Sequence, residues 1–433
     1  MGSKPTHPTS TAEAGDPQPA GWRRALGGLR VPTSGMDALS YVDFRWVWTG
    51  AFVAFLAMNM QWVARGWLVL HLSDNSPLAL AMVMASFALP MTVISIVGGA
   101  LSDRIPRKYL LVYVQVVNAV VTLGVAVLDM TGAIQYWHIL VSGLMNGTLM
   151  AFNMPSRQAI ISDILPDGKL MSGIALVSSG MNATRIVGPA LAGFLILIIG
   201  THGVFVLIAL AYLVSGLSMA KLKTGDHYKP RSGKSMKGDI LAGLSYAAKE
   251  PTLLSLLVMA FIPVLFGMSY NALLPAWAKE ALNIEPDGLG LLFMVMGIGA
   301  LAGSLALANM GGFRRCGAVL LASCVAWGVA LALFSQSTSF IIALPLLLVI
   351  GFMSSVYMAL NSTLIQLYAA PEMRGRVTSI SMMSFGALPL SAVPFGALAE
   401  GIGTPNALTL SGILLLCFTI AFALLRPAFR RIA

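Results

Sequence analysis

Long apolar stretches recur along almost the whole chain, and they constrain the fold more than any other feature of the sequence. A helix crosses the hydrocarbon core of a bilayer in about 20 residues. Segments of that kind lie at 47–71, 78–102, 109–129, 136–156, 171–199, 202–220, 252–277, 286–309, 316–335, 338–360, 378–399 and 405–425. Only helices and closed barrels satisfy the backbone in lipid, and these unbroken runs lack the alternation of barrel strands. The sequence therefore predicts an all-α membrane protein with twelve transmembrane helices.

The composition agrees with a lipid environment. Only 10% of the 433 residues are charged and 57% are hydrophobic, whereas soluble domains carry about 25% charged residues. A net charge of +10 would suggest a nucleic-acid-binding protein if the chain were soluble, but its distribution among the loops explains it better, so no nucleic-acid partner is expected. The three cysteines lie in or beside apolar segments without metal-binding spacing. We expect no disulfide, no metal and no cofactor.

The positions of Lys and Arg predict the orientation of the helices. All 27 except Arg65, Arg185 and Lys279 fall in the two tails or in alternate loops, with Arg157 assigned to the loop after the fourth segment. Cytoplasmic loops of membrane proteins are enriched in these residues. Both termini are therefore predicted to be cytoplasmic, in a bacterial inner membrane. Residues 1–40 lack the apolar region of a signal peptide and are expected to form a disordered cytoplasmic tail.

The polar stretch 222–250 divides the chain into two halves of six segments each, 41–221 and 251–427, and is predicted to be a cytoplasmic linker. The halves contain similar short sequences in the same order: Met150-Ala-Phe-Asn153 resembles Met358-Ala-Leu-Asn361. Internal repeats of this kind place a substrate site near the middle of the membrane, at the interface between the halves. We therefore expect two pseudo-symmetric six-helix halves and a small-molecule substrate.

A motif at the end of the second segment resembles the signature of a known family. The run Gly98-Gly99-Ala-Leu101-Ser-Asp103-Arg104-Ile-Pro-Arg107-Lys108 fills every position of G-x-L-x-D-R-x-x-R-K, which marks the major facilitator superfamily at this loop. Topology alone would explain the cations, but not an acid among them. The resemblance implies the major facilitator fold and a charge cluster that latches the halves in one state. The latch residues would be Gly99, Asp103, Arg104, Arg107, Lys108 and Asp163.

Other stretches resemble the branch of this family that contains the enterobactin exporter and macrolide-efflux proteins. They include Asn153-Met-Pro-Ser-Arg157-Gln-Ala and Arg185-Ile-Val-Gly188-Pro-Ala-Leu-Ala-Gly193. The resemblance implies a secondary active transporter that exports a small amphipathic or anionic solute, such as a drug-like compound, siderophore or metabolite. It also implies alternating access coupled to proton antiport. We expect a monomer whose partners are the solute, protons and the lipid bilayer.

Two arginines lie inside predicted spans. Arg185 is near the middle of its helix, where an uncompensated charge is costly, and no acid lies at matching depth. It either binds an anionic part of the substrate or takes part in coupling, or it fixes helix packing through carbonyls and amides. Arg65 is expected to extend its head group towards the membrane surface, and a role in substrate binding or coupling is the alternative. Further candidates for the solute path are Gln61, Asn118, Asn153, Asn271, Asn361, Trp62, Tyr270 and Tyr357, for which helix packing is the alternative explanation.

Several other functions are open to a chain of this kind. The same fold could serve an uptake permease, since nothing in the loops shows direction. A channel or a sensor is a remoter alternative. An enzyme is not expected, because the five histidines lie in tails or at helix ends, far from paired acids. The run Ser232-Gly-Lys234-Ser lacks the first glycine of a phosphate-binding loop and no strand precedes it.

Overall fold

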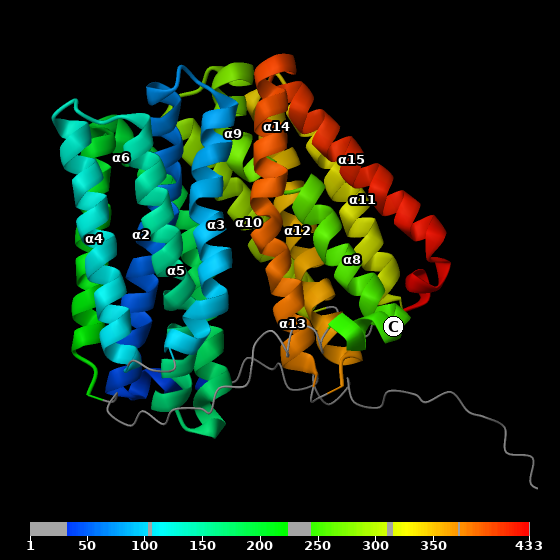
Figure 1. Cartoon of the computed structure of the whole chain (residues 1–433), viewed down its shortest axis with the longest axis horizontal. Helices are drawn as coiled ribbons and strands as arrows, with labels where there is room; N and C mark the ends of the chain where they lie inside the picture. The colour runs from blue at the N-terminus through cyan, green and yellow to red at the C-terminus, as the bar shows by residue number, and fades with distance from the viewer. Residues whose placement is uncertain (1–32, 103–105, 224–243, 310–314, 371–372, 433) are drawn as a thin grey trace, which may run out of the picture.

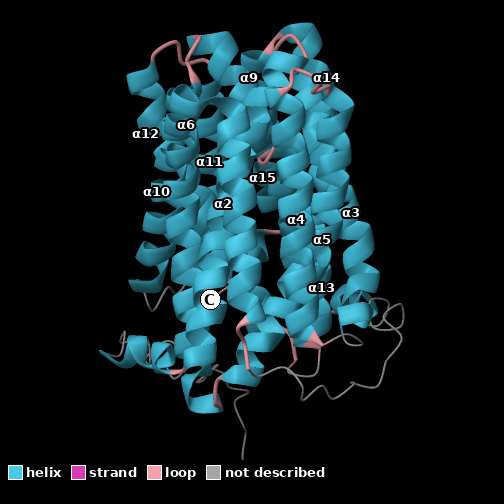
Figure 2. Cartoon of the chain, turned by 90° about the vertical axis from the view of Figure 1, so that its left-hand side faces the viewer, coloured by secondary structure: helices cyan, strands magenta, loops and turns pink. Residues whose placement is uncertain are grey.

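The computed structural model describes residues 33–102, 106–223, 244–309, 315–370 and 373–432. All regular elements in these ranges are helices, and most of them lie side by side along one direction (Figure 1). A second view shows the same all-helical bundle with short loops at its two ends (Figure 2). The chain is thus an all-α membrane protein, as the sequence predicts.

The first helices of the chain pack against one another as one group. They are η1 (Thr33–Ser40), α2 (Val42–Leu72), α3 (Pro77–Ser102), α4 (Arg107–Met130), α5 (Tyr136–Ile164) and α6 (Asp167–Ala220). We call this set the first group. The end of the bundle where α4 begins is called the basic end, and the opposite one the far end.

The label α6 covers two helices that run in opposite directions. Gly200 has φ 69° and ψ 174°, a conformation open to glycine but strained for other residues. The chain turns there at the far end, where Thr201 donates a hydrogen bond to Asp129 at the end of α4. Lys108, at the start of α4, donates to the carbonyl of Leu222 at 2.6 Å. The second part of α6 therefore returns to the basic end.

The remaining helices form the second group. They are α8 (Pro251–Phe266), α9 (Tyr270–Leu282), α10 (Pro286–Asn309), α11 (Cys316–Ser335), α12 (Phe340–Tyr368), α13 (Arg374–Met383), η2 (Ser384–Ala387), α14 (Leu388–Ile402), α15 (Thr404–Leu425) and η3 (Pro427–Arg431). Both α8 and α10 begin at a proline, which suits the first turn of a helix because its nitrogen needs no partner there.

Two spans of the second group are interrupted. Residues 267–269 separate α8 from α9, and η2 separates α13 from α14. Pro389 has no N–H to donate to the carbonyl of Phe385, which lies four residues earlier. The carbonyl accepts instead from the N–H of Leu388, and the chain tightens into the 3₁₀ turn η2. The sequence analysis treated both spans as continuous helices.

Ten stretches of the described chain are long and apolar enough to cross a membrane. One of them covers both parts of α6, which raises the count to eleven. The twelfth helix is α5. It is not among the ten apolar stretches, because it contains Asn146, Asn153 and Arg157, but it packs with α3 and α4 in the same bundle. The described residues therefore contain twelve helices that are counted as membrane spans.

Three expectations about boundaries need correction or fall outside the described residues. Residues 33–40 form the helix η1, so this part of the predicted disordered tail is structured. The fourth span continues to Ile164 rather than ending at 156, because Arg157 is buried beside its partner Asn153 and is followed by the buried Ile160 and Ile161. The linker predicted for 222–250 and the latch residues Asp103 and Arg104 lie partly or wholly outside the described residues.

Small residues bring the two groups into contact. A Cβ added at Gly290 on α10 would lie 2.6 Å from the carbonyl oxygen of Pro189 on α6, and one at Gly396 on α14 would lie 2.6 Å from the Cβ of Ala81 on α3. Close packing through small residues is a common way for membrane helices to associate. The groups therefore meet along two helix pairs, and in Figure 1 their ribbons separate towards the basic end.

A carboxylate links the two groups at the far end. Glu400, near the end of α14, accepts a hydrogen bond from Ser76 Oγ and a second one, at 3.3 Å, from the backbone N–H of Leu78. These donors lie at the start of α3, where the helix dipole favours a negative charge. We call the contact of Glu400 with Ser76 and Leu78 the far-end clamp.

Removal of the clamp carboxylate should loosen the far end. We expect Glu400→Ala to broaden and lengthen the distance distribution between spin labels at positions 131 and 336, measured in a variant that lacks the three native cysteines. The exposed Thr131 and Gln336 end helices of different groups at the far end. Glu250→Ala is the control, since Glu250 is exposed before α8 and lies away from the far end. Equal distributions in all three proteins would show that the clamp does not hold this end closed.

Candidate functional site: a polar cavity with two buried arginines

The first group encloses a cavity of about 230 Å³. Its walls come from α2, α3, α4, α5 and the second part of α6. Apolar side chains form much of the lining: Phe55, Met58, Trp62, Phe87, Met91 and Met150. Trp62 and Phe87 meet edge to face, with their ring centroids 6.3 Å apart. Methionine adapts to irregular apolar partners, so these walls can accommodate an apolar solute of variable shape.

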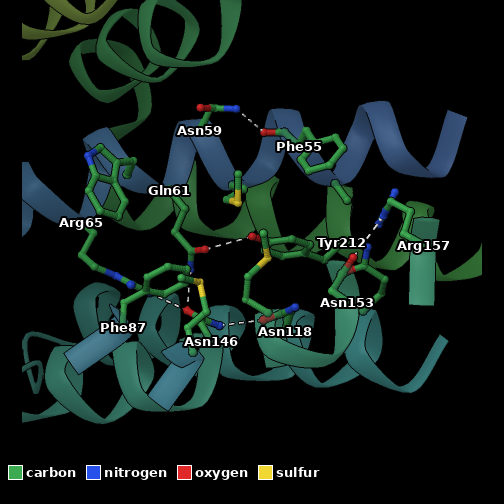
Figure 3. Close-up of a pocket in the computed structure, with 16 residues that line it drawn as sticks. Phe55, Asn59, Gln61, Arg65, Phe87, Asn118, Asn146, Asn153, Arg157 and Tyr212 are labelled. Carbon is green, nitrogen blue, oxygen red and sulfur yellow. Dashed lines mark hydrogen bonds between the residues drawn. The ribbon is translucent and has the colours of Figure 1, made fainter. Parts of the chain in front are cut away.

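A network of amides runs along one side of this cavity, with Asn146 of α5 at its centre (Figure 3). Asn146 Nδ2 donates to Asn118 Oδ1 at 2.8 Å, and its Oδ1 accepts from Gln61 Nε2 at 3.3 Å. Gln61 Nε2 also donates to Thr122, and Gln61 Oε1 accepts from the hydroxyl of Tyr212 at 3.1 Å. Four helices are thus joined by polar side chains inside an apolar bundle.

Arg65 of α2 belongs to this network. Its Nη2 donates to Asn146 Oδ1 at 2.6 Å, and the residue is only 7% exposed. The expectation that Arg65 extends to the membrane surface is wrong, because the side chain points into the cavity, where Asn146 supplies an acceptor (Figure 3). Gln61 and Asn153 also line this cavity, as predicted for the solute path.

Arg157 is the lining residue that sequence analysis missed. It was assigned to a loop, but α5 continues past it and the residue is 3% exposed. Its Nε donates to Asn153 Oδ1 at 3.1 Å, and its Cζ lies 5.2 Å from the centroid of the Phe55 ring. The spacing of four residues between Asn153 and Arg157, followed by Ala159-Ile160-Ile161, is the signal that could have indicated a continuing helix.

A second cavity of about 180 Å³ adjoins the first, since Asn59 and Trp62 line both. It lies between the two groups: Arg185 comes from α6, whereas Tyr270 and Asn271 come from α9. Four residues predicted for substrate binding, coupling or the solute path therefore meet here: Trp62, Arg185, Tyr270 and Asn271. The Arg185 side chain makes no hydrogen bond or ion pair with any residue that the structure describes.

Two predicted path residues lie elsewhere. Tyr357 is buried, and its hydroxyl donates to the carbonyl of Met259 at 2.7 Å. Asn361 is also buried, and neither residue lines the two cavities. Thus Asn153 faces a cavity, whereas Asn361 at the matching position of the internal repeat does not.

The described latch residues lie at the basic end. Arg107 forms an ion pair with Asp163 at the end of α5 and donates to the carbonyl of Ala159 at 3.4 Å. Lys108 contacts the end of α6 through Leu222, and Gly99 lies within α3. The charge pair between Arg107 and Asp163 is present as expected. Its function as a latch stays a prediction.

The charge of the cavities is one-sided. Arg65, Arg157 and Arg185 line them, and none of the described lining residues is an acid. Among the described residues, no group of His, Cys, Asp and Glu could hold a metal ion. The site can therefore offer guanidinium groups, amides and aromatic rings to a solute, and it favours a negative charge or a hydrogen-bond acceptor.

Loss of the central amide should weaken the first group. We expect Asn146→Ala to lower the unfolding free energy by about 1–3 kcal/mol, because a buried arginine and two amides each lose a partner. Thermal unfolding of the purified protein in detergent would measure this. Asn406→Ala is the control, since Asn406 is exposed at the far end. Equal unfolding temperatures for the two variants would contradict a structural role for the network.

Known proteins resemble this chain over nearly its whole length. A model of the family of transmembrane secretion effectors matches residues 33–430. Macrolide efflux protein A of Streptococcus pyogenes is 22% identical over 88% of this chain and 95% of its own. The staphyloferrin A transporter of Staphylococcus aureus is 24% identical over 87% and 95%, and the multidrug efflux pump Tap of Mycolicibacterium fortuitum is 26% identical over 79% and 85%.

Solved structures show a similar fold. A bacterial homologue of the human lysosomal transporter Spinster, in an inward-facing and unoccupied conformation, superposes with a TM-score of 0.70 at 13% identity, covering 90% of this chain and 98% of that one. The nucleoside transporter NupG gives a TM-score of 0.69 at 14% identity, covering 89% and 98%. Because the family model covers more than half of the chain, the protein belongs to the transmembrane secretion effectors, a family of major facilitator transporters rather than of enzymes.

Proposed function

We propose that this transporter exports a small amphipathic or anionic solute from the cytoplasm by alternating access. The observation that carries the proposal is the cavity of the first group, which combines buried arginines and amides with aromatic and methionine walls. Such a lining suits a solute with an apolar body and a negatively charged or acceptor group. The adjoining cavity between the groups gives that solute contacts on both sides.

The direction of export rests on orientation and on the relatives. Arg107, Lys108 and Lys169 lie at the basic end, together with the described ends of the chain (Figure 1). The enrichment of Lys and Arg in cytoplasmic segments supports a cytoplasmic position for this end. Relatives with efflux or export in their names support outward transport by this chain as well. The two termini would then both be cytoplasmic.

Alternating access would proceed by rocking of the halves 41–221 and 251–427, joined by the linker 222–250. The far-end clamp and the packing of α3 against α14 favour a state that is closed at the far end. This state corresponds to an inward-facing transporter, which is also the conformation of the solved Spinster homologue. The Arg107–Asp163 cluster would hold the basic end in the opposite state.

The energy source is proposed to be an inward flow of protons. Since none of the described lining residues is an acid, the proton would bind at a helix end rather than in the cavities.

Everted membrane vesicles test both the direction and the coupling. In vesicles from cells that make the protein, we expect accumulation of some members of a panel of fluorescent hydrophobic dyes and catechol-type siderophores. A proton uncoupler should abolish it, and vesicles from cells without the protein are the control. If no compound accumulates and preloaded vesicles instead lose their contents through the protein, the protein is an uptake permease.

The latch can be tested separately through its described ion pair. We expect Asp163→Asn to lower the transport rate by up to about fivefold without changing the amount of protein in the membrane, since an exposed ion pair contributes up to about 1 kcal/mol. Asp37→Asn, which breaks the Lys169–Asp37 pair at the same end, is the control. A transport rate for Asp163→Asn equal to that of the control would show that the Arg107–Asp163 pair does not act as a latch.

A further inference from the structure

The least satisfied polar group of the first cavity is the guanidinium of Arg157. Its Nε donates to Asn153, but its Nη1 is buried and has no hydrogen-bond partner among the described residues. A guanidinium has five N–H donors and cannot accept. The ring of Phe55 covers the group at 5.2 Å without offering an oxygen. A buried arginine in this condition is incomplete without an acceptor from outside the described chain.

The neighbouring arginine is in a different condition. Arg65 already donates to Asn146, whose own amide is held by Asn118. Arg65 therefore has an acceptor within the first group, whereas Arg157 Nη1 has none among the described residues. Since no acid lines the cavity among the described residues, a ligand is the natural source of an acceptor for Arg157.

The two arginines lie at different depths. Figure 3 shows them at opposite ends of the lining. Phe55, which contacts Arg157, and Arg65 are ten residues apart on α2, or about 15 Å along the helix axis. Arg157 is seven residues before the end of α5 at Ile164, so it lies about 10 Å from the basic end. A solute that enters from this end reaches Arg157 first.

We propose that Arg157 anchors a carboxylate or phosphate group of the solute and that the transported class is organic anions with an apolar body. The inference rests on the proposed function, because it names the substrate of the same cavity. The charged group binds the free edge of the guanidinium, and the apolar body lies along the walls formed by Phe55, Met58 and Met150. A guanidinium pairs with both oxygens of such a group, which a lysine cannot reproduce.

Ligand-dependent unfolding of the full-length protein tests the anchor. The probes are naphthalene carboxylates and naphthyl phosphates of increasing length, each paired with its uncharged ester or alcohol, and the protein is held in discs of phosphatidylcholine. We expect the anionic probes to raise the unfolding temperature and the uncharged ones not to do so. The rise should disappear in Arg157→Gln and shrink in Arg157→Lys. Arg315→Gln, at an exposed position before α11, should retain it.

The ligand-free variants separate an anchor from a structural residue. Without probe, Arg157→Gln should unfold at the same temperature as the wild type or higher, because the substitution removes a buried charge whose Nη1 has no hydrogen-bond partner among the described residues. A lower unfolding temperature would mean that Arg157 serves to hold α5 and α2 together. Equal responses to charged and uncharged probes, no response to any anionic probe, or an unchanged response in Arg157→Gln would each overturn the proposal.

Two further measurements identify the source of the anion and separate the anchor from the proposed function. If the unfolding temperature of Arg157→Gln differs from that of the wild type only in discs that contain phosphatidylglycerol, the site binds a lipid head group and the proposal fails. Everted vesicles give the second measurement. If they accumulate only uncharged or cationic dyes, equally well with the wild type and with Arg157→Gln at the same expression level, the protein is an exporter but Arg157 is not an anion anchor. If the probes bind through Arg157 but nothing is exported, the anchor stands and export falls.

Discussion

Lipid offers no hydrogen bonds, and the structure depends on how the protein supplies them from within. Backbone groups are satisfied by the helices themselves, which leaves the side-chain amides and arginines as the groups that need partners. Asn146 supplies such partners in the first group, because its single amide both donates to Asn118 and accepts from Gln61 and Arg65. These hydrogen bonds hold α5 against its neighbours and so shape the cavity.

The buried polar residues of the second group are serines and threonines with one amide, Asn361, among the described residues. Trp327 lies between Tyr270 and Tyr357, with ring centroids 6.3 Å and 6.2 Å away, and Tyr357 donates its hydroxyl to a backbone carbonyl. The second group thus has no amide network like that around Asn146 in the part of the chain that the structure describes. The internal repeat in the sequence therefore describes how the halves are built, whereas the chemistry of the cavity is concentrated in one of them.

Much of the architecture could be predicted because it follows from length and hydropathy, which are local properties. The membrane spans are of this kind. The ion pair of Arg107 with Asp163 was instead expected from the resemblance of its motif to a known family. Arg157 was assigned to a loop, because a charge after a run of apolar residues looks like the start of a loop until its partner Asn153 is considered. Arg65 was placed within a span, but the direction of its side chain depends on Asn146 of another helix, whose position hydropathy does not give.

The broken helices of the second group affect how the two groups meet. In the first group, α2 runs without interruption from end to end, whereas the interruption at residues 267–269 leaves α9 as a separate short helix after α8. Helix α9 contacts the first group: a Cβ on Gly66 would meet the ring of Pro275 at 3.1 Å, and Lys279 lies over the ring of Trp67 at 5.8 Å. The segment that the interruption sets apart from α8 therefore supplies part of the contact between the two groups near the far end.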